Sequence, residues 1–322
     1  MTSKIHNKHG LRERAILVQV NTSLFGTQKK DRDATEDAAV RYGAEKTQVA
    51  VTKSILNRKN PAFDRIVKIK GLIRNAHLAT TGVWDDSYRI ISTKRYGQWR
   101  ETMDEFRQDF DAAVEDLIKV LPDIKAEAQQ NLGQLYDPSL IPDADTLRCE
   151  FSVDIKVEVL PERGHIALDL DAEHLARITE EAGAADNSRL ERLTRETHER
   201  VRDELEKMSE ALREFGNDLP NTKRTRTFRD SLVKRMAGMS DILPGLNVTG
   251  DPKLDKLSRA IAAKLTVVDA AELRGDKKPG DKRSKEQRDA DASKKREEIA
   301  DAADSLLADL GNVFGASADK AA

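Results

Sequence analysis

The sequence has 322 residues, of which 38% are hydrophobic, only 4% aromatic and 35% charged. Ordinary domains are about 25% charged, so this composition favours long helices exposed to solvent. The 55 basic and 57 acidic residues give a net charge of −2, which excludes a general attraction to nucleic acid or membranes. The single cysteine excludes a disulfide framework and a cysteine-rich metal site.

The N-terminal segment is polar and lacks the apolar core of a signal peptide. No apolar run elsewhere approaches the roughly 18 residues that a membrane span needs. We therefore expect residues 1–14 to be disordered. We also expect a soluble, cytoplasmic protein that has no contact with a membrane.

Alternating apolar and polar residues predict a small sheet. The clearest strand is 147–159, in which seven apolar residues alternate with polar ones. Residues 15–24 and 88–92 are shorter candidates, and 166–170 would form a hairpin with the first strand through the turn 161–164. One face of each strand is polar, so we expect three or four antiparallel strands.

Most of the remaining chain has the spacing of amphipathic helices. Apolar residues recur in a heptad pattern from Tyr96 to Val120 and end before Pro122. A second helix is predicted over Ser188–Phe215, with the same spacing after Val201 and nearly only charged residues before it. The apolar face of the first helix is larger than one small sheet can cover. We therefore expect this face to pack partly on the second helix and partly on another chain. The predicted fold class is α+β, mainly α.

The predicted body spans residues 15–273, and the remainder differs in character. Residues 274–298 hold ten basic and seven acidic residues and, as apolar residues, only two alanines, too few to offset the entropy of folding. We expect a disordered charged linker there, an amphipathic helix over 299–316 and a disordered tail over 317–322. The helix is predicted to dock in a groove of its own body, of a sister subunit or of an ATPase. Its docking residues are Ile299, Leu306, Leu310 and Val313.

Motifs of the common nucleotide-binding enzymes and hydrolases are missing from the sequence. Cys149 falls on the apolar face of the predicted strand 147–159, where a thiol is usually a small core residue. A cluster of Asp169, Asp171, Glu173 and His174 resembles a set of cation ligands, but Asp171 and Glu173 also suit the start of a helix. We therefore predict no catalytic residues, no metal, no cofactor and a protein that is not an enzyme.

Local charge is strongly asymmetric. Residues 41–100 hold thirteen basic and four acidic residues, a net charge of +9, and residues 223–235 add +5. Four aromatic residues lie among these bases, as in proteins that bind single-stranded nucleic acid by stacking and phosphate attraction: Trp84, Tyr88, Tyr96 and Trp99. The alternative is that the bases pair with acidic stretches of neighbouring helices or subunits, such as 101–130, and that Tyr96 and Trp99 are the first residues of the heptad pattern. The candidate nucleic-acid-binding residues are Lys53, Arg58, Lys59, Arg65, Lys68, Lys70, Arg74, Arg95, Lys223, Arg224, Arg226 and Arg229.

Three stretches of the sequence resemble a known family. They are Leu17–Gly26 with two lysines soon after it, the helix Tyr96–Leu117, and Leu246–Pro252 with two leucines in the following turns. Together they are similar to uncharacterised proteins of tailed phages and some bacteria, classed as a domain of unknown function. The resemblance covers residues 17–273. Phe25 departs from the pattern, because many members have a tryptophan there.

Members of that family are often encoded beside a MoxR-type AAA+ ATPase and a von Willebrand A-domain protein. The resemblance therefore implies a non-enzymatic component of an ATPase-driven assembly, in the bacterial host cytoplasm if the chain is phage-encoded. Two functions follow as hypotheses. One is a structural or adaptor protein that forms an elongated oligomeric helical assembly and docks a partner such as the AAA+ ATPase. The other is a protein that binds single-stranded or duplex DNA in phage replication or recombination.

Overall fold

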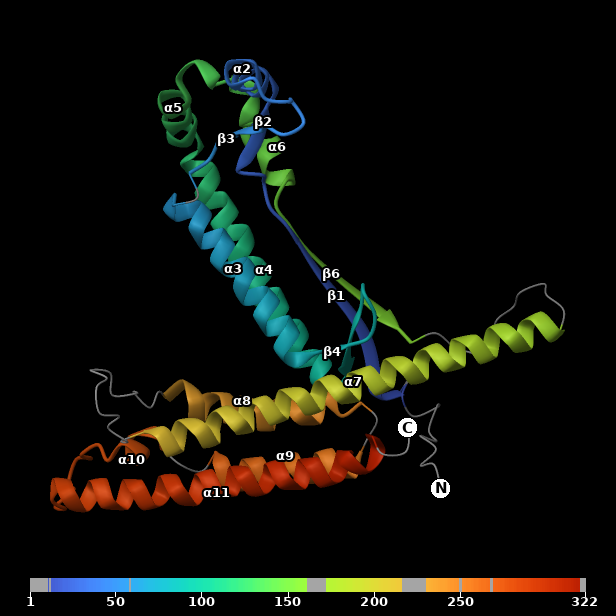
Figure 1. Ribbon diagram of the computed structural model, residues 1–322, viewed down its shortest axis with the longest axis vertical. Helices are drawn as coiled ribbons and strands as arrows, with labels where there is room; N and C mark the ends of the chain where they lie inside the picture. Colours follow the sequence, from blue (N-terminus) through green and yellow to red (C-terminus); the bar gives the residue numbers. More distant parts are fainter. Residues whose placement is uncertain are drawn as a thin grey trace. The chain divides into compact units, whose positions relative to one another are not determined.

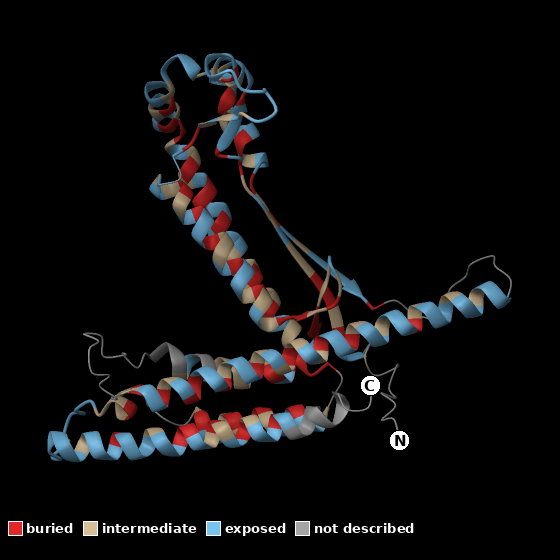
Figure 2. Ribbon diagram, viewed as in Figure 1, coloured by how far each residue is buried: buried red, intermediate tan, exposed pale blue. Residues whose placement is uncertain are grey.

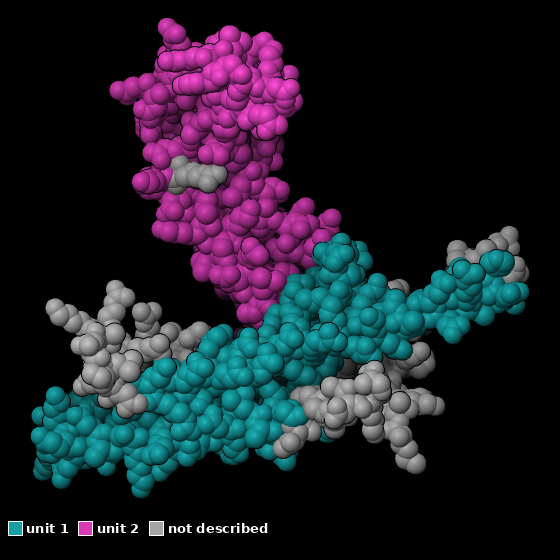
Figure 3. Space-filling view, viewed as in Figure 1, with its two compact units in different colours: residues 1–18, 80–96, 158–322 teal, residues 19–79, 97–157 magenta. Residues whose placement is uncertain are grey.

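The computed structural model describes residues 11, 13–57, 59–160, 172–215, 230–248, 251–266 and 269–318. Long helices dominate and two small sheets accompany them (Figure 1), which confirms the predicted α+β, mainly α, fold class. The chain forms two compact units (Figure 3). Unit 1 contains Met1–Val18, Thr80–Tyr96 and Glu158–Ala322, and unit 2 contains Gln19–Ala79 and Gly97–Val157.

The larger sheet has four antiparallel strands in the order β4-β5-β1-β6. They are β1 (Ala15–Ser23), β4 (Gly82–Val83), β5 (Arg89–Ser92) and β6 (Ser152–Val159). Ala15 lies opposite Ser92 in the pairing of β1 with β5, so the predicted strands 15–24 and 88–92 are confirmed. The predicted strand 166–170 and its turn lie outside the described residues.

The smaller sheet has no counterpart among the predicted strands. β2 (Gln28–Asp31) pairs antiparallel with β3 (Val51–Ser54), and Lys29 lies opposite Lys53. The charged and polar residues of these strands give no clear alternation of apolar side chains. The pairing joins residues that are far apart in the sequence, so local patterns could not predict it.

The strand predicted over 147–159 begins only at Ser152. The residues before it form helix α6 (Ala144–Cys149). Asp143 caps this helix, because its carboxylate accepts a hydrogen bond from the backbone N–H of Thr146 at 2.9 Å. The cap lies outside the alternating run, so alternation alone favours a strand over these residues.

Cys149 is exposed, so its predicted place in the core is wrong. Leu147 and Phe151 are buried on either side of it. These two residues are four positions apart, a spacing that suits one face of a helix as well as one face of a strand. The alternation was therefore ambiguous at its start, and the helical alternative turns Cys149 toward solvent.

Most of unit 2 is helical. The helices that lie wholly or mostly in it are α2 (Arg32–Tyr42), α3 (Pro61–Thr80), α4 (Thr93–Lys119), α5 (Leu121–Leu132) and α6, with the 3₁₀ helices η1 (Gly133–Leu135) and η2 (Pro138–Leu140). Asn60 opens α3, because its side-chain oxygen accepts from the backbone N–H of Ala62 at 3.0 Å. The end of α4 before Pro122 agrees with the prediction.

The heptad face of α4 is buried within unit 2. Its buried residues are Trp99, Met103, Phe110, Ala113, Val114 and Leu117. The ring of Trp99 lies 5.8 Å from His77 of α3, and the ring of Phe110 lies 6.4 Å from Phe151, which precedes β6. The chain itself therefore covers these six residues, and no second chain is needed to bury them.

Unit 1 contains the other long helices. They are α7 (Ala172–Glu214), α8 (Asp230–Leu246), α9 (Pro252–Leu265), α10 (Ala270–Arg274) and α11 (Lys285–Ala318). One core cluster joins all five helices, and Figure 2 shows the buried stripe along α7 and α11. From α7 it contains Val201, Leu205, Met208 and Leu212. The predicted packing of this stripe on Tyr96–Val120 is wrong, because α8 to α11 cover it instead.

Helix α11 begins at Lys285, so the disordered linker predicted over 274–298 is wrong for its second half. A reciprocal pair of hydrogen bonds starts the helix. The backbone N–H of Gln287 donates to the Ser284 hydroxyl at 3.2 Å, and the backbone N–H of Ser284 donates to the Gln287 side-chain oxygen at 3.0 Å. This arrangement is a capping box, in which two backbone donors are satisfied at once.

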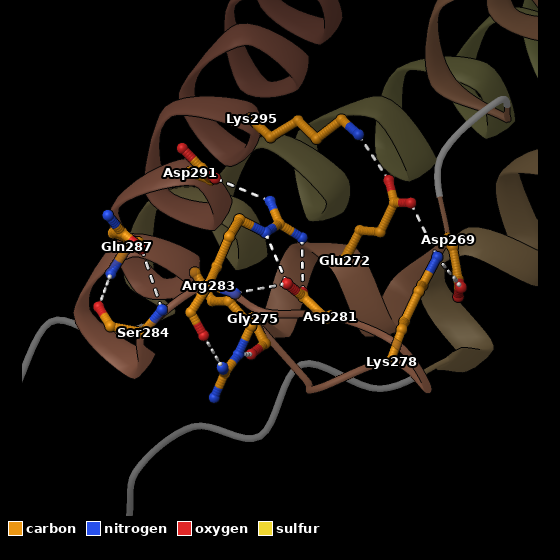
Figure 4. A network of polar contacts seen from close by, with 11 residues as sticks. Asp269, Glu272, Gly275, Lys278, Asp281, Arg283, Ser284, Gln287, Asp291 and Lys295 are labelled. Atoms are coloured by element: carbon orange, nitrogen blue, oxygen red, sulfur yellow. Dashed lines mark hydrogen bonds and ion pairs between the residues drawn. The ribbon is translucent and has the colours of Figure 1, made fainter.

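Ion pairs join the charged segment to the rest of unit 1 (Figure 4). The carboxylate of Glu272 in α10 lies 2.8 Å from the Lys278 ammonium and 2.5 Å from the Lys295 ammonium in α11. Arg283 lies 2.8 Å from Asp291. Exposed pairs of this kind contribute about 0–1 kcal/mol each. We infer that the apolar stripe of α11, which continues the same helix, supplies most of the stabilisation.

The predicted docking residues belong to that stripe. Ile299, Leu306 and Leu310 are buried in the core cluster of unit 1, and the side chain of Val313 lies outside the described part of the chain. The prediction of a tethered helix free to bind a partner is therefore wrong. Of the three predicted grooves, the helix occupies the one on its own body. No helix in the described ranges is both long and apolar enough to span a membrane.

Candidate functional site

Two of the predicted nucleic-acid-binding residues form ion pairs on α3. The guanidinium of Arg65 lies 2.7 Å from the carboxylate of Asp116 in α4. The ammonium of Lys68 lies 2.6 Å from Asp64, one turn earlier on the same helix. The Arg65 pair supports the alternative hypothesis, because Asp116 belongs to the acidic stretch 101–130. The Lys68 pair does not test it, because Asp64 lies inside the basic stretch itself.

Lys53 lines a cleft of about 400 Å³ between β3 and α5. Its ammonium lies 2.9 Å from the carboxylate of Asp31 and donates to the carbonyl of Leu135 at 3.0 Å. Asp31 also accepts from the backbone N–H of Ala34 at 3.0 Å, and this bond, followed by the bond from Lys53, lowers the pKa of Asp31. Lys53 thus joins β3, the start of α2 and η1, which is a structural role.

Three other predicted cations have no carboxylate partner among the described residues. Lys59 and Arg74 are exposed, and Lys70 is half-buried on α3. Arg95 lies elsewhere, in unit 1, where its stem packs across Gly245. A Cβ atom at position 245 would lie 2.8 Å from the Arg95 Cγ. The predicted residues outside the described part of the chain are Arg58, Lys223, Arg224, Arg226 and Arg229.

The tryptophans that suggested base stacking are buried. Trp84 and Trp99 each expose only 3% of their surface. Arg189 of α7 lies over the Trp84 ring, 5.7 Å from its centre, and Arg192 donates to the Trp84 carbonyl at 2.6 Å. Base stacking needs an exposed ring face, so this part of the nucleic-acid hypothesis is wrong for these two residues. Both are core residues.

Sequence patterns gave no signal for the polar cluster that joins α7 to the sheet. The carboxylate of Glu196 accepts from the backbone N–H of Val83 at 2.7 Å, from Arg89 at 3.1 Å and from Arg200 at 2.7 Å. Burial lowers the pKa of Arg89, and the charge of Glu196 opposes this effect. The cluster satisfies a backbone donor of β4, which is an edge strand of the sheet. Its role is therefore structural.

One of the stretches that carry the family resemblance closes the connection from α8 to α9. The side-chain amide of Asn247 donates to the Asp251 carbonyl and to the Asp255 carboxylate, both at 2.8 Å. The backbone N–H of Asp251 donates back to the Asn247 side-chain oxygen at 2.8 Å. Leu246 and Val248 are buried. This stretch thus has a structural role, and the described part of it offers no group for catalysis.

Groups of three or more metal-ligating side chains do not occur among the described residues. Asp169 and Asp171, two of the candidate cation ligands, lie outside those residues. Burial lowers the pKa of His198 in α7 to about 4, against the opposing charge of Asp251. A half-buried histidine that stays neutral at pH 7 within a helix packing fits a structural role.

The N-terminal part of α7, Ala172–Arg189, differs from the rest of the helix and is called the α7 arm below. Gly183 is its only buried residue. A hollow of about 760 Å³ lies along one face of the arm. The residues that line it are mostly small: Ala172, Leu175, Ala176, Thr179, Glu180, Gly183, Ala184 and Asn187. Small side chains allow another helix to approach closely, so this face is the candidate docking surface.

Comparison with known protein families, curated proteins and solved structures finds no match to the chain. The family resemblance set out from the sequence therefore stays a prediction.

Proposed function

We propose that this protein is a non-enzymatic structural or adaptor protein that forms an oligomeric helical assembly and docks a partner. The observation that carries the proposal is the α7 arm. The long apolar stripes of α4, α7 and α11 are buried within the chain, whereas the arm presents a hollow, small-residue face. A partner helix would bury this face.

Charge on the arm supports the same proposal. Arg177 pairs with Glu181 at 3.0 Å, and Arg189 pairs with Asp186 at 2.9 Å. Pairs at spacings of three and four residues stabilise a solvated helix. The arm can therefore stay helical, and among the described residues only those of α7 itself line its small-residue face.

The proposed partner is an AAA+ ATPase of the MoxR type, alone or with a von Willebrand A-domain protein. Support for this choice comes only from the resemblance of the sequence to the phage and bacterial family. A phage origin and a place in the bacterial cytoplasm belong to the same proposal.

Calorimetry of the purified protein with a purified MoxR-type ATPase from the same genome tests the docking surface. Ala176 and Ala185 are both exposed alanines of the arm, but they lie on opposite faces, because successive helical residues are about 100° apart. We expect Ala176→Arg to weaken binding at least about tenfold and the control Ala185→Arg to change it less than about twofold. Equal effects of the two variants, or no binding by the unmodified protein, would contradict the proposal.

DNA binding is a second candidate function, supported by Lys59, Lys70 and Arg74, which have no carboxylate partner within the described ranges of the chain. Phosphate contacts release counterions, so affinity should fall with salt at a logarithmic slope of about −0.7 per phosphate of a single strand. We expect the double change Lys70→Glu and Arg74→Glu to flatten this slope by about two phosphates. Lys68→Glu, at a paired cation, is the control. If the double variant has the same salt slope as the unmodified protein, this surface is excluded as a DNA-binding site.

A further inference from the structure

The two edges of the four-stranded sheet are protected differently. At one edge, β4 has two residues, and Glu196 binds the backbone N–H of Val83. At the other edge, β6 has eight residues, and no strand lies beyond it among the described residues (Figure 1). A long edge strand presents a row of backbone donors and acceptors, a ready template for another strand.

The apolar face of β6 is also progressively uncovered along the strand. Val153 is buried and Ile155 is half-buried, whereas Val157 is 39% exposed and Val159 is 80% exposed. The opposite face begins with Ser152 and continues with charges of alternating sign, Asp154, Lys156 and Glu158. An added strand must therefore offer apolar side chains on one face and complementary charges on the other.

A second copy of β6 meets both requirements in one antiparallel register. If a twofold axis passes beside Ile155, this residue faces its own copy and Val153 faces Val157 of the second copy. On the other face, Asp154 lies opposite Lys156 of the second copy, and the symmetry repeats this pair. Each apolar residue then faces an apolar residue, and both of these cross-strand charge pairs are attractive.

Other registers fit less well. Centring the pair on Lys156 places two lysines opposite each other and Asp154 opposite Glu158, which is repulsive. A shift by one residue puts apolar side chains opposite charged ones. Centring on Val157 pairs Lys156 with Glu158, but the overlap is shorter, and Glu158 already accepts a hydrogen bond from the hydroxyl of Tyr88.

We propose that two copies of the chain join through antiparallel pairing of their β6 strands about Ile155, so that the sheet extends from four to eight strands. This inference rests on the oligomeric part of the proposed function and names its interface. The segment 166–170, which the sequence predicts as a strand, is the competing occupant of the same edge.

Cysteine cross-linking of the full chain tests the register. Cys149 is the single cysteine, so the variants are made with Cys149→Ser. Directly opposite residues of an antiparallel pair have Cα atoms about 4.5–5.5 Å apart, within the range of a disulfide. We expect Ile155→Cys to give at least about ten times more cross-linked dimer than Val159→Cys, whose two copies would be roughly 27 Å apart at 3.4 Å per residue.

The control is demanding because Val159 is far more exposed than Ile155. Random collision would favour cross-linking at Val159→Cys, and that result would overturn the proposal. Dominant cross-linking at Val157→Cys would overturn it in favour of the alternative register. An intrachain disulfide between Val159→Cys and Ile166→Cys in a monomeric protein would show that the chain's own segment occupies the edge.

Charge exchange gives a second, independent readout by sedimentation. Asp154→Lys places lysine opposite lysine, and we expect it to raise the dimer dissociation constant at least about tenfold. Adding Lys156→Asp restores both pairs with reversed sign, so we expect the double variant to dimerise within about threefold of the original. Failure of this rescue would overturn the pairing.

The outcomes also separate this inference from the proposed function. An oligomer that shows no cross-link at Ile155→Cys contradicts the β6 interface and leaves the oligomeric assembly standing. A protein that stays monomeric at about 100 µM contradicts both, since association follows mass action. Binding of the ATPase through the α7 arm is unaffected by either result.

Discussion

The two long helix pairs of this molecule bury their apolar faces with different side chains. In unit 2, α3 and α4 bring aromatic rings together, with Phe63 lying 6.5 Å and Phe110 lying 6.4 Å from the ring of Phe151. In unit 1, α7 and α11 interlock aliphatic residues such as Leu205 and Leu306 with fully buried alanines. Aromatic packing concentrates its energy in few residues, whereas the aliphatic stripe spreads it along the helices. Single substitutions should therefore cost most in unit 2.

Phe110→Ala is expected to have the largest effect. Its side chain is fully buried and contacts Phe151, so truncation should lower the free energy of unfolding by about 3–5 kcal/mol. Phe106 belongs to the same heptad pattern but is half-buried, and Phe106→Ala should cost clearly less. Urea denaturation of both variants measures the difference. Equal losses would show that the two positions are equally buried, which would contradict a core centred on Phe110 and Phe151.

Leu205→Ala tests the aliphatic pair. Leu205 of α7 is fully buried in the core cluster that α7 forms with α8 to α11. Truncations of this kind cost about 2–5 kcal/mol, depending on how far the surrounding residues fill the cavity. The same core cluster contains small residues of α11 such as Ala300 and Ala303. We expect such residues to let α11 shift toward the cavity, which places the cost in the lower half of that range. A loss larger than that of Phe110→Ala would reverse the comparison between the two units.

His198 should make unit 1 sensitive to acid. Burial lowers its pKa in the folded protein from 6.5 to about 4, so the folded state binds the proton less well than the unfolded state. The stabilisation is complete above pH 6.5 and is lost as the pH falls toward 4. We expect the free energy of unfolding to fall by about 1–2 kcal/mol over this pH range. This is less than the full pKa shift would give, because the residue is partly solvated.

Thermal denaturation at a series of pH values measures this effect. His198→Gln removes the titrating group at similar size, so the loss of stability between pH 6.5 and 4 should shrink in this variant. His174→Gln, at an exposed histidine of the α7 arm, is the control and should keep the original slope. The same slope in all three proteins would contradict the assignment.

Local signals predicted the parts of the fold that depend on neighbours in sequence. Alternation predicted β1 and β5, and the heptad pattern with Pro122 predicted the end of α4. The strand prediction for 147–159 was wrong at its start, because the apolar residues there fit the period of a helix as well as that of a strand. Composition did not predict that residues 285–298 are helical, because their structure depends on contacts with residues outside this segment. Lys295 pairs with Glu272, and Arg296 donates to the Leu273 carbonyl.

The candidate sites show the same division. Net charge counted along the chain predicted a basic surface, but Arg65 and Asp116 are 51 positions apart and still form a pair. Charge counting assigns a net charge to a segment without showing which side chains meet. The sequence predicted that the first half of the helix 188–215, which is part of α7, is charged and exposed, and this is correct only in part. Burial in α7 begins at Leu190, apart from Gly183, and so before the predicted seam at Val201.

The smallest expected effect concerns the ion pairs around Glu272. Hydrogen bonds from Lys278 and then Lys295 lower the pKa of Glu272 from 4.5 to about 2. A lowered pKa means that the stabilisation is present above pH 4.5 and is lost as the pH falls toward 2. Because the side chain is 37% exposed, water screens both pairs, and we expect Glu272→Gln to cost less than about 1 kcal/mol at pH 7.

The pH dependence makes this small effect measurable. The difference in stability between the original protein and Glu272→Gln should vanish between pH 4.5 and 2, because protonation removes the same charge in the original protein. Glu297→Gln, at an exposed residue of α11 with no ion pair among the described residues, should show no such change. If Glu272→Gln instead melts α11, seen as a loss of helical circular dichroism at pH 7, the ion pairs hold the charged segment in place. The apolar stripe would then contribute less to its order than the burial of Ile299 and Leu306 indicates.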